Sequence, residues 1–178
     1  GTEAQGQGWR NIAPPESIPM PKPAFDSIFV LCTGRCGSTT LARACGHASN
    51  WTAGHETRSH LLGEARLDYP TRHVEVDNRL SWMLGRLETR YGPNAGYVHL
   101  TRDPEAVAQS YAARAAYGIM HAYAQGIVFP SPAAEGPRPM LDYARDMVAT
   151  VTANIDAFLV GKPHVMRLTT EALTRDLP

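Results

Sequence analysis

Residues 33–40 bring glycines, hydroxyl side chains and one arginine together in a single short stretch, TGRCGSTT. Gly34 and Gly37 allow the backbone to turn tightly and to approach a ligand closely. A helix that begins at Ser38 directs its free N–H groups and its positive dipole end at the loop, where they attract an anion. Arg35 adds a fixed charge that can contact two anionic oxygens. The stretch therefore predicts a site for a phosphate-type group.

A second candidate anion site surrounds Arg102, which Asp103 and Pro104 follow directly and Ser110 follows eight positions later. Asp103 and Pro104 are typical of a helix start. The alternatives are a local ion pair between Arg102 and Asp103 and a surface role for Ser110. In an open parallel sheet, ligands bind at the carboxyl ends of strands, where both arginines are expected. Two anion sites at one edge favour a ligand with phosphate at both ends.

The elements that position these residues follow from hydrophobic runs and turn signals. Strands are predicted over residues 27–32, 53–56, 72–77, 96–101 and 164–168, and helices over residues 38–46, 59–66, 80–90, from 104 onward, and 141–160. Strands that alternate with helices imply crossover connections. We expect a three-layer α/β fold with a mainly parallel sheet flanked by helices, like that of P-loop NTPases. Residues 1–24 read as a Pro/Gly-rich leader, residues 25–178 as one domain, and residues 126–138 as a loop.

Composition excludes several classes of partner. Lys plus Arg equals Asp plus Glu, with 17 of each, so no overall field attracts nucleic acid. The sequence shows no apolar run of membrane-spanning length and no signal peptide, and the expected location is the cytoplasm. Cys32, Cys36 and Cys45 lack zinc-site spacing and are expected to be free thiols, with no bound metal.

The loop departs from the Walker pattern, which places Gly-Lys-Ser/Thr after Gly and four residues. This loop carries no lysine, and no obvious strand-end acid is available to hold magnesium. A kinase would lack two of its usual means of stabilising a moving phosphoryl group. A nucleotide kinase stays open as an alternative, and so does a simple glycine turn before an N-capped helix.

Taken together, the two segments resemble the motifs of the sulfotransferase superfamily. Residues 33–41 occupy the position of its 5′-phosphosulfate loop, and Arg102, Asp103, Pro104 and Ser110 match its 3′-phosphate motif. The arginine in the loop resembles the one found at this position in the bacterial and carbohydrate-modifying branches of the family. Residues 167–173 resemble the family's late strand and its Glu-x-Leu segment. The sequence ends before a later basic segment that covers the nucleotide in many members, so a catalytically degenerate nucleotide-binding module is a further alternative.

The resemblance implies sulfuryl transfer from the co-substrate 3′-phosphoadenosine 5′-phosphosulfate to an acceptor hydroxyl or amine. The implied donor-binding residues are Gly34, Arg35, Cys36, Gly37, Ser38, Thr39, Thr40, Arg102 and Ser110. The reaction needs a base for the acceptor proton and positive charge at the leaving oxygen, which Arg35 would supply. Some bacterial members of the family place a catalytic glutamate in a comparable short segment. The resemblance therefore implies that Glu56 is the base, with His55 as the second candidate.

Three points stay open at this stage. Glu56 could instead cap a helix that starts near Thr57. Glu75, Asp77, Asn78 and Arg79 form a polar run that lines either an acceptor pocket or a solvated turn. The acceptor itself, a small molecule, carbohydrate, lipid or peptide, and the oligomeric state do not follow from the sequence.

Overall fold

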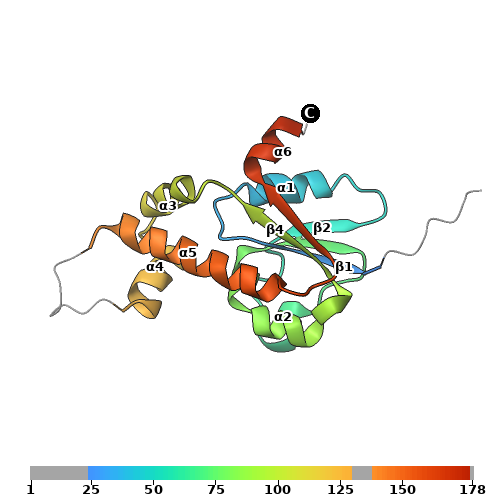
Figure 1. Ribbon diagram of the computed structural model, residues 1–178. Helices are drawn as coiled ribbons and strands as arrows, with labels where there is room; N and C mark the ends of the chain where they lie inside the picture. The colour runs from blue at the N-terminus through green and yellow to red at the C-terminus, as the bar shows by residue number, and fades with distance from the viewer. Residues whose placement is uncertain (1–23, 130–137, 177–178) are drawn as a thin grey trace, which may run out of the picture.

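The computed structural model describes residues 24–129 and 138–176, and its sheet has five strands that all run parallel (Figure 1). The strands are β1 (Ser27–Leu31), β2 (Thr52–His55), β3 (His73–Val76), β4 (Gly96–Thr101) and β5 (Val165–Thr169). Their spatial order is β2-β3-β1-β4-β5. This arrangement confirms the expected α/β class. Residues 1–23 of the expected leader lie outside the described residues, and the division into a leader and one domain stays a prediction.

The central strand β1 is buried on both faces. Phe29 and Leu31 point into one hydrophobic core, whereas Val30 and Cys32 point into the other. All four side chains are at most 1% exposed. Parallel sheets need cover on both faces, because their crossover connections pack against both sides. The run of apolar residues from Ile28 to Leu31 reflects this position.

The larger core lies beneath α2 (Leu84–Arg90), α3 (Pro104–Ala112), α4 (Gly118–Ala122) and α5 (Met140–Leu159). The long helix α5 crosses this face of the sheet (Figure 1). Its buried residues recur at helical spacing and include Met147, Val151 and Ile155. The π-helical turn η4 (Tyr123–Ile127) follows α4, so the expected loop begins only after it. Residues 130–137 of that loop lie outside the described residues.

The opposite face is covered by α1 (Ser38–Cys45) and α6 (Thr170–Asp176), which lie near one another above the sheet (Figure 1). Leu41 and Ala42 of α1 and Leu173 of α6 pack on Val30 and Val76 of the strands. The sheet is therefore the middle layer of three, as the strand and helix pattern predicts.

Two predicted helices in the middle of the chain were wrong in detail. In place of a helix over 59–66, the chain forms turns and the 3₁₀ helix η1 (Gly63–Leu67), because Gly63 takes a left-handed φ of 57°. In place of a helix over 80–90, the 3₁₀ helix η2 (Asn78–Trp82) comes first and α2 begins only at Leu84. A short 3₁₀ turn, η3 (Gly92–Asn94), then leads into β4.

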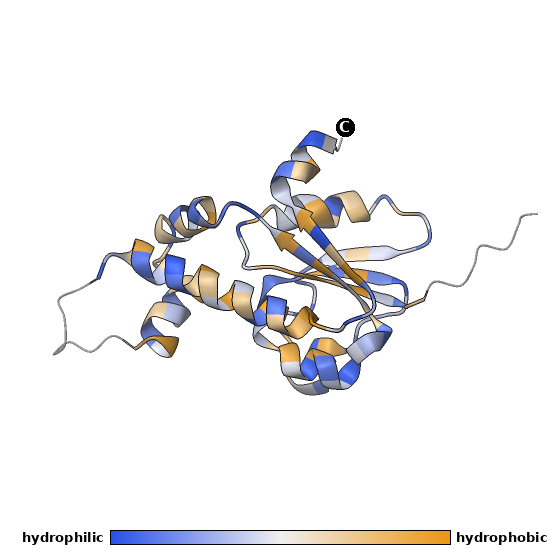
Figure 2. Ribbon diagram, viewed as in Figure 1, coloured by the Kyte–Doolittle hydropathy of each residue, from blue (hydrophilic) through white to orange (hydrophobic). Residues whose placement is uncertain are grey.

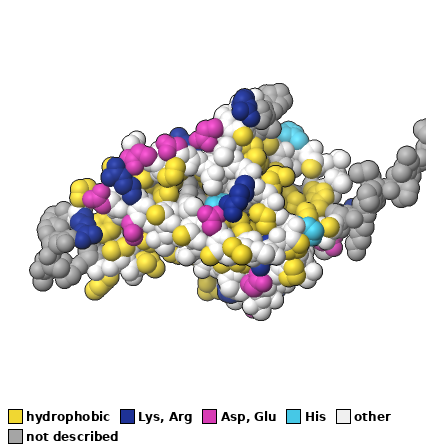
Figure 3. All heavy atoms as spheres, in the orientation of Figure 1, with side chains coloured by type: hydrophobic (Ala, Val, Ile, Leu, Met, Phe, Trp, Pro, Cys, Tyr) yellow, Lys and Arg dark blue, Asp and Glu magenta, His cyan; other side chains and the backbone are white. Residues whose placement is uncertain are grey.

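Hydrophobic and hydrophilic residues alternate along α5, which appears in Figure 2 as orange and blue segments in turn. The face that carries α5 shows acidic and basic side chains interspersed (Figure 3). Glu105 of α3 and Arg145 of α5 form one such pair, at 2.8 Å. Within the described ranges, no helix combines the length and hydrophobicity that crossing a bilayer requires.

Candidate functional site

The loop after β1 takes a backbone path that ordinary residues rarely adopt. Gly34, Arg35 and Gly37 all have left-handed φ angles, of 86°, 58° and 79°. The path ends at Gly37, whose carbonyl accepts the first α1 bond from the Leu41 amide at 3.0 Å. Since the helix begins at the next residue, the loop and the amino terminus of α1 lie at the carboxyl end of β1. The predicted strand, loop and helix are confirmed as elements.

Close packing explains why glycine stands at position 34. A Cβ atom there would lie 2.1 Å from the Tyr111 hydroxyl and 2.7 Å from Nδ2 of Asn78. The same Tyr111 hydroxyl donates to the carbonyl oxygen of Thr33 at 2.6 Å. Burial raises the pKa of Tyr111, so this hydroxyl keeps its proton and stays a donor. Helix α3 therefore holds the loop through a tyrosine side chain.

The two predicted anion motifs contact each other directly. Nε of Arg35 donates to Oγ of Ser110 at 2.9 Å. Nη1 of Arg102 donates to the carbonyl oxygen of Arg35 at 3.1 Å. Asp103 instead caps α3, where its carboxylate accepts from the Glu105 amide at 3.3 Å. Arg35, Arg102 and Ser110 thus form one polar cluster at the carboxyl edge of β1 and β4.

A threonine at the start of α6, directly after the last strand, closes the loop on its other side. The Thr170 hydroxyl lies 2.6 Å from the Cys36 carbonyl oxygen and 3.1 Å from the Thr101 carbonyl oxygen. Its methyl group is the nearest atom to a Cβ built at Gly37, at 3.3 Å. Sequence reasoning missed Thr170, although its place directly after β5 corresponds to that of Arg102 directly after β4. Tyr111 was also missed as a loop contact; its position next to Ser110 was the available signal.

The remaining residues of the loop differ in accessibility. Thr39 and Thr40 lie exposed in the first turn of α1, and Ser38 is half-buried. The Cys36 side chain is fully buried, so its backbone N–H is the group that can face a ligand. A hydrogen bond from Cys32 lowers the pKa of the Cys36 thiol, although burial opposes this. All three cysteines are free, as predicted.

The two candidate bases have different partners. Nε2 of His55 lies 3.1 Å from Oγ of Ser38, which joins the end of β2 to the start of α1. The Glu56 carboxylate forms an ion pair with Arg79, and both side chains are partly exposed. Residues 57–60 form a turn, so Glu56 does not begin a helix at Thr57. His55 thus reaches the loop, and Glu56 lies beside it facing η2.

The polar run at the end of β3 divides between the interior and the edge. Glu75 and Asp77 are fully buried, contrary to a place in a solvated turn. Asp77 accepts from Nη2 of Arg66 at 2.5 Å and from the backbone amide of Arg79 at 2.8 Å. Arg79, in contrast to Glu75 and Asp77, has a partly exposed side chain. The run therefore anchors the edge from inside and presents Arg79 next to Glu56.

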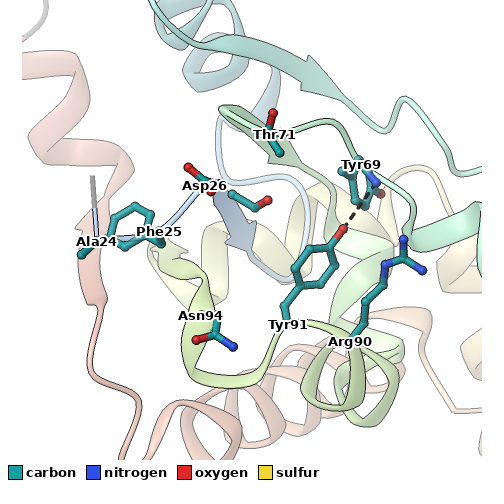
Figure 4. A pocket seen from close by; sticks show the side chains of 9 residues that line it. Ala24, Phe25, Asp26, Tyr69, Thr71, Arg90, Tyr91 and Asn94 are labelled. Carbon is teal, nitrogen blue, oxygen red and sulfur yellow. Dashed lines mark hydrogen bonds between the residues drawn. The ribbon is translucent and has the colours of Figure 1, made fainter. Parts of the chain in front are cut away.

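A separate pocket lies at the other end of the sheet. About 750 Å³ in volume, it opens beside Asp26, Tyr69, Arg90 and Tyr91, next to the amino ends of the strands (Figure 4). Tyr91 accepts there from the Tyr69 amide at 3.3 Å, as the dashed line marks. The site residues named above are absent from its lining, so the pocket is separate from the polar cluster. Across residues 24–129 and 138–176, no group of three or more His, Cys, Asp or Glu side chains could hold a metal ion.

Comparisons with known proteins agree with this architecture at the level of the fold. No protein-family model matches the chain, and a search of curated proteins finds no match. Among solved structures, the chain is similar to a sulfotransferase from Alicyclobacillus acidocaldarius, with a TM-score of 0.56 and 14% identity. The match covers 84% of this chain and 74% of the other. At this identity the likeness shows a shared fold: a five-stranded parallel sheet with flanking helices, as in a sulfotransferase.

Proposed function

We propose that this protein transfers a sulfuryl group from 3′-phosphoadenosine 5′-phosphosulfate to an acceptor hydroxyl or amine. The observation that carries the proposal is the direct contact between the two anion motifs, Arg35 with Ser110 and Arg102 with the Arg35 carbonyl. A donor with a phosphosulfate at one end and a 3′-phosphate at the other needs two such sites at one edge. The fold shared with a sulfotransferase supports the same reading.

In the proposed reaction, the residues of the loop bind the 5′-phosphosulfate. Backbone N–H groups of residues 34–40 and the hydroxyls of Ser38, Thr39 and Thr40 donate to its oxygens. Arg102 and Ser110 bind the 3′-phosphate. Arg35, which already reaches Ser110, carries the charge that stabilises the leaving phosphate oxygen.

A base takes the proton of the acceptor as its oxygen or nitrogen attacks sulfur. The bond between sulfur and the bridging oxygen breaks, and adenosine 3′,5′-bisphosphate leaves with both bonding electrons. We assign the base to Glu56, and His55 is the alternative because its Nε2 contacts Ser38 of the loop. Glu56 and Arg79 form an ion pair at the same edge, which would place the acceptor over β2 and η2.

The test is an assay of pooled acceptors with sulfur-labelled donor in the presence of a chelator, followed by mass spectrometry. Sulfated product and adenosine 3′,5′-bisphosphate should form in equal amounts without magnesium. Magnesium-dependent phosphorylation from a nucleoside triphosphate would instead indicate a kinase. Binding of the bisphosphate with no transfer to any pool would indicate a degenerate nucleotide-binding module. The productive acceptor pool would also distinguish among carbohydrate, lipid and small-molecule substrates.

A further inference from the structure

Glu75 is a carboxylate in the interior of the sheet that neither the binding loop nor the proposed base uses. It lies in β3 and is 0% exposed. Its Oε1 accepts from the Thr57 backbone amide at 2.7 Å, and its Oε2 accepts from the Thr57 hydroxyl at 2.8 Å. Oε2 also lies 2.9 Å from Nε2 of His73. A buried carboxylate is costly unless such partners surround it.

These partners lower the pKa of Glu75. Burial alone would raise it, but the hydrogen bonds from His73 and Thr57 outweigh that effect. The other ring nitrogen of His73 lies 2.8 Å from the Thr52 hydroxyl at the start of β2. The carboxylate therefore joins the start of β2, β3 and the turn that follows β2 through one set of hydrogen bonds.

Both candidate bases directly precede the turn that Glu75 holds: His55 ends β2, and Glu56 lies between β2 and the turn. Glu56 directly precedes Thr57 and has a φ of 53°, which is an uncommon left-handed conformation for a residue with a side chain. Its amide donates to the Val76 carbonyl at 3.1 Å, so β3 holds two consecutive amides, those of Glu56 and Thr57. Fixing both amides counteracts the tendency of Glu56 to relax to a negative φ.

Gly54 makes this approach of Glu75 and Thr57 possible. It pairs with Glu75 across β2 and β3. A Cβ at position 54 would lie 2.2 Å from the Thr57 methyl group and 3.1 Å from Oε2 of Glu75. Residues 54–57, Gly-His-Glu-Thr, thus act as one unit. Gly54 leaves room for the Glu75 carboxylate, and Thr57 donates hydrogen bonds to it.

We propose that Glu75 is a positioning residue, which holds the turn at Thr57 so that Glu56 and His55 keep their places beside the loop. The inference rests on the proposed function for its effect on turnover, whereas the anchoring of Thr57 is independent of it. Glu75 itself contacts neither donor nor acceptor in this proposal.

The central experiment compares Thr57→Val with Thr57→Ser. Valine keeps the shape of threonine and removes the hydroxyl, whereas serine keeps it, and Thr57 is exposed enough for both to fold. Turnover per bisphosphate-binding site should fall in Thr57→Val by on the order of tenfold to a hundredfold, as for a misplaced catalytic group. Thr57→Ser should regain most of that loss. Bisphosphate affinity and donor KM should change little in either variant.

A double-mutant cycle tests whether Glu75 acts through the base. Glu75→Gln should lower turnover in the wild-type background and add little in Glu56→Gln, because the base it positions is already gone. Equal losses in the wild-type, Glu56→Gln and His55→Ala backgrounds would overturn the inference, as would full turnover in Thr57→Val. If His55 is the base, the same non-additivity should appear with His55→Ala instead.

A readout without catalysis separates this inference from the proposed function. Hydrogen exchange at the Thr57 amide, followed by NMR, should be slow in the wild type and markedly faster in Glu75→Ala, while the Leu41 amide of α1 serves as the control. Unchanged exchange at Thr57 would reject the anchor. If the wild type transfers no sulfuryl group, the proposed function fails, and exchange alone decides whether Glu75 holds this turn.

Discussion

Nε of Arg35 lies 2.9 Å from Oγ of Ser110, although 75 positions separate the two residues in the sequence. The contact joins the loop after β1 to the second turn of α3. Because Arg102 also donates to the carbonyl of Arg35, the proposed 5′ and 3′ phosphate sites share one arginine between them. Binding of a phosphate at one site should therefore change the affinity of the other site.

Arg102→Ala should weaken adenosine 3′,5′-bisphosphate far more than adenosine 5′-phosphate, which lacks the 3′ group. The expected loss is about 1.5–3 kcal/mol, as for a hydrogen bond to a charged group. Calorimetry measures both ligands, and Arg43→Ala, an exposed arginine near the end of α1, is the control. A small equal loss for both ligands would mean that Arg102 acts only through the Arg35 carbonyl.

Gly34→Ala should abolish tight bisphosphate binding, because its Cβ would lie 2.1 Å from the Tyr111 hydroxyl and its φ is left-handed. The matched control is Gly85→Ala in α2, where a Cβ meets nothing within 4 Å. That variant should keep its affinity and gain roughly 0.5–1 kcal/mol of stability from helix propensity. Similar affinities in the two variants would contradict the close packing of the loop.

Glu56→Gln keeps the shape of the side chain and removes its basicity. We expect turnover to fall by roughly a hundredfold to ten-thousandfold while bisphosphate affinity stays nearly unchanged. His55→Ala serves as the comparison, since it also removes the contact with Ser38. If only His55→Ala lowers turnover, the base is the histidine. If neither variant does, the assignment of the base to residue 55 or 56 is wrong.

The burial of His99 leads us to expect a loss of stability in mild acid. Burial lowers its pKa, the neighbouring Asp156 opposes this, and Arg167 reinforces it. The folded protein thus binds a proton at His99 less readily than the unfolded chain, in which histidine titrates near pH 6.5, so the free energy of unfolding should decrease as pH falls below about 6.5. Urea unfolding at pH 8 and pH 5.5 should show a smaller decrease in His99→Gln than in the wild type. An exposed histidine variant, His47→Gln, should behave like the wild type.

The sequence was sufficient for the elements that carry strong local signals. The apolar strand predicted over residues 27–32, the glycine loop and the Asp103 cap of α3 all formed, because each depends on neighbours along the chain. Contacts such as Tyr111 with Thr33 depend instead on how α3 packs over the sheet. Local patterns contain no information on that packing.

Strand β3 shows how a regular pattern can mislead. His73, Glu75 and Asp77 alternate with Val74 and Val76, which is typical of a strand with one solvated face. In the structure the polar face is buried beneath the preceding segment. Thr57 and Arg66 donate hydrogen bonds to the carboxylates of Glu75 and Asp77, and the Tyr69 ring stacks on His73. The positioning role proposed for Glu75 was therefore invisible until the fold was known.

The contact of the Thr170 hydroxyl affects the order in which the chain folds during synthesis. This hydroxyl contacts the Cys36 carbonyl across 134 positions, and the strand before it pairs with β4. During synthesis the loop emerges from the ribosome long before this threonine does. The nascent chain must therefore hold an unfinished binding loop until β5 docks, and ligand should protect the chain from proteolysis only after residue 170 has emerged from the ribosome.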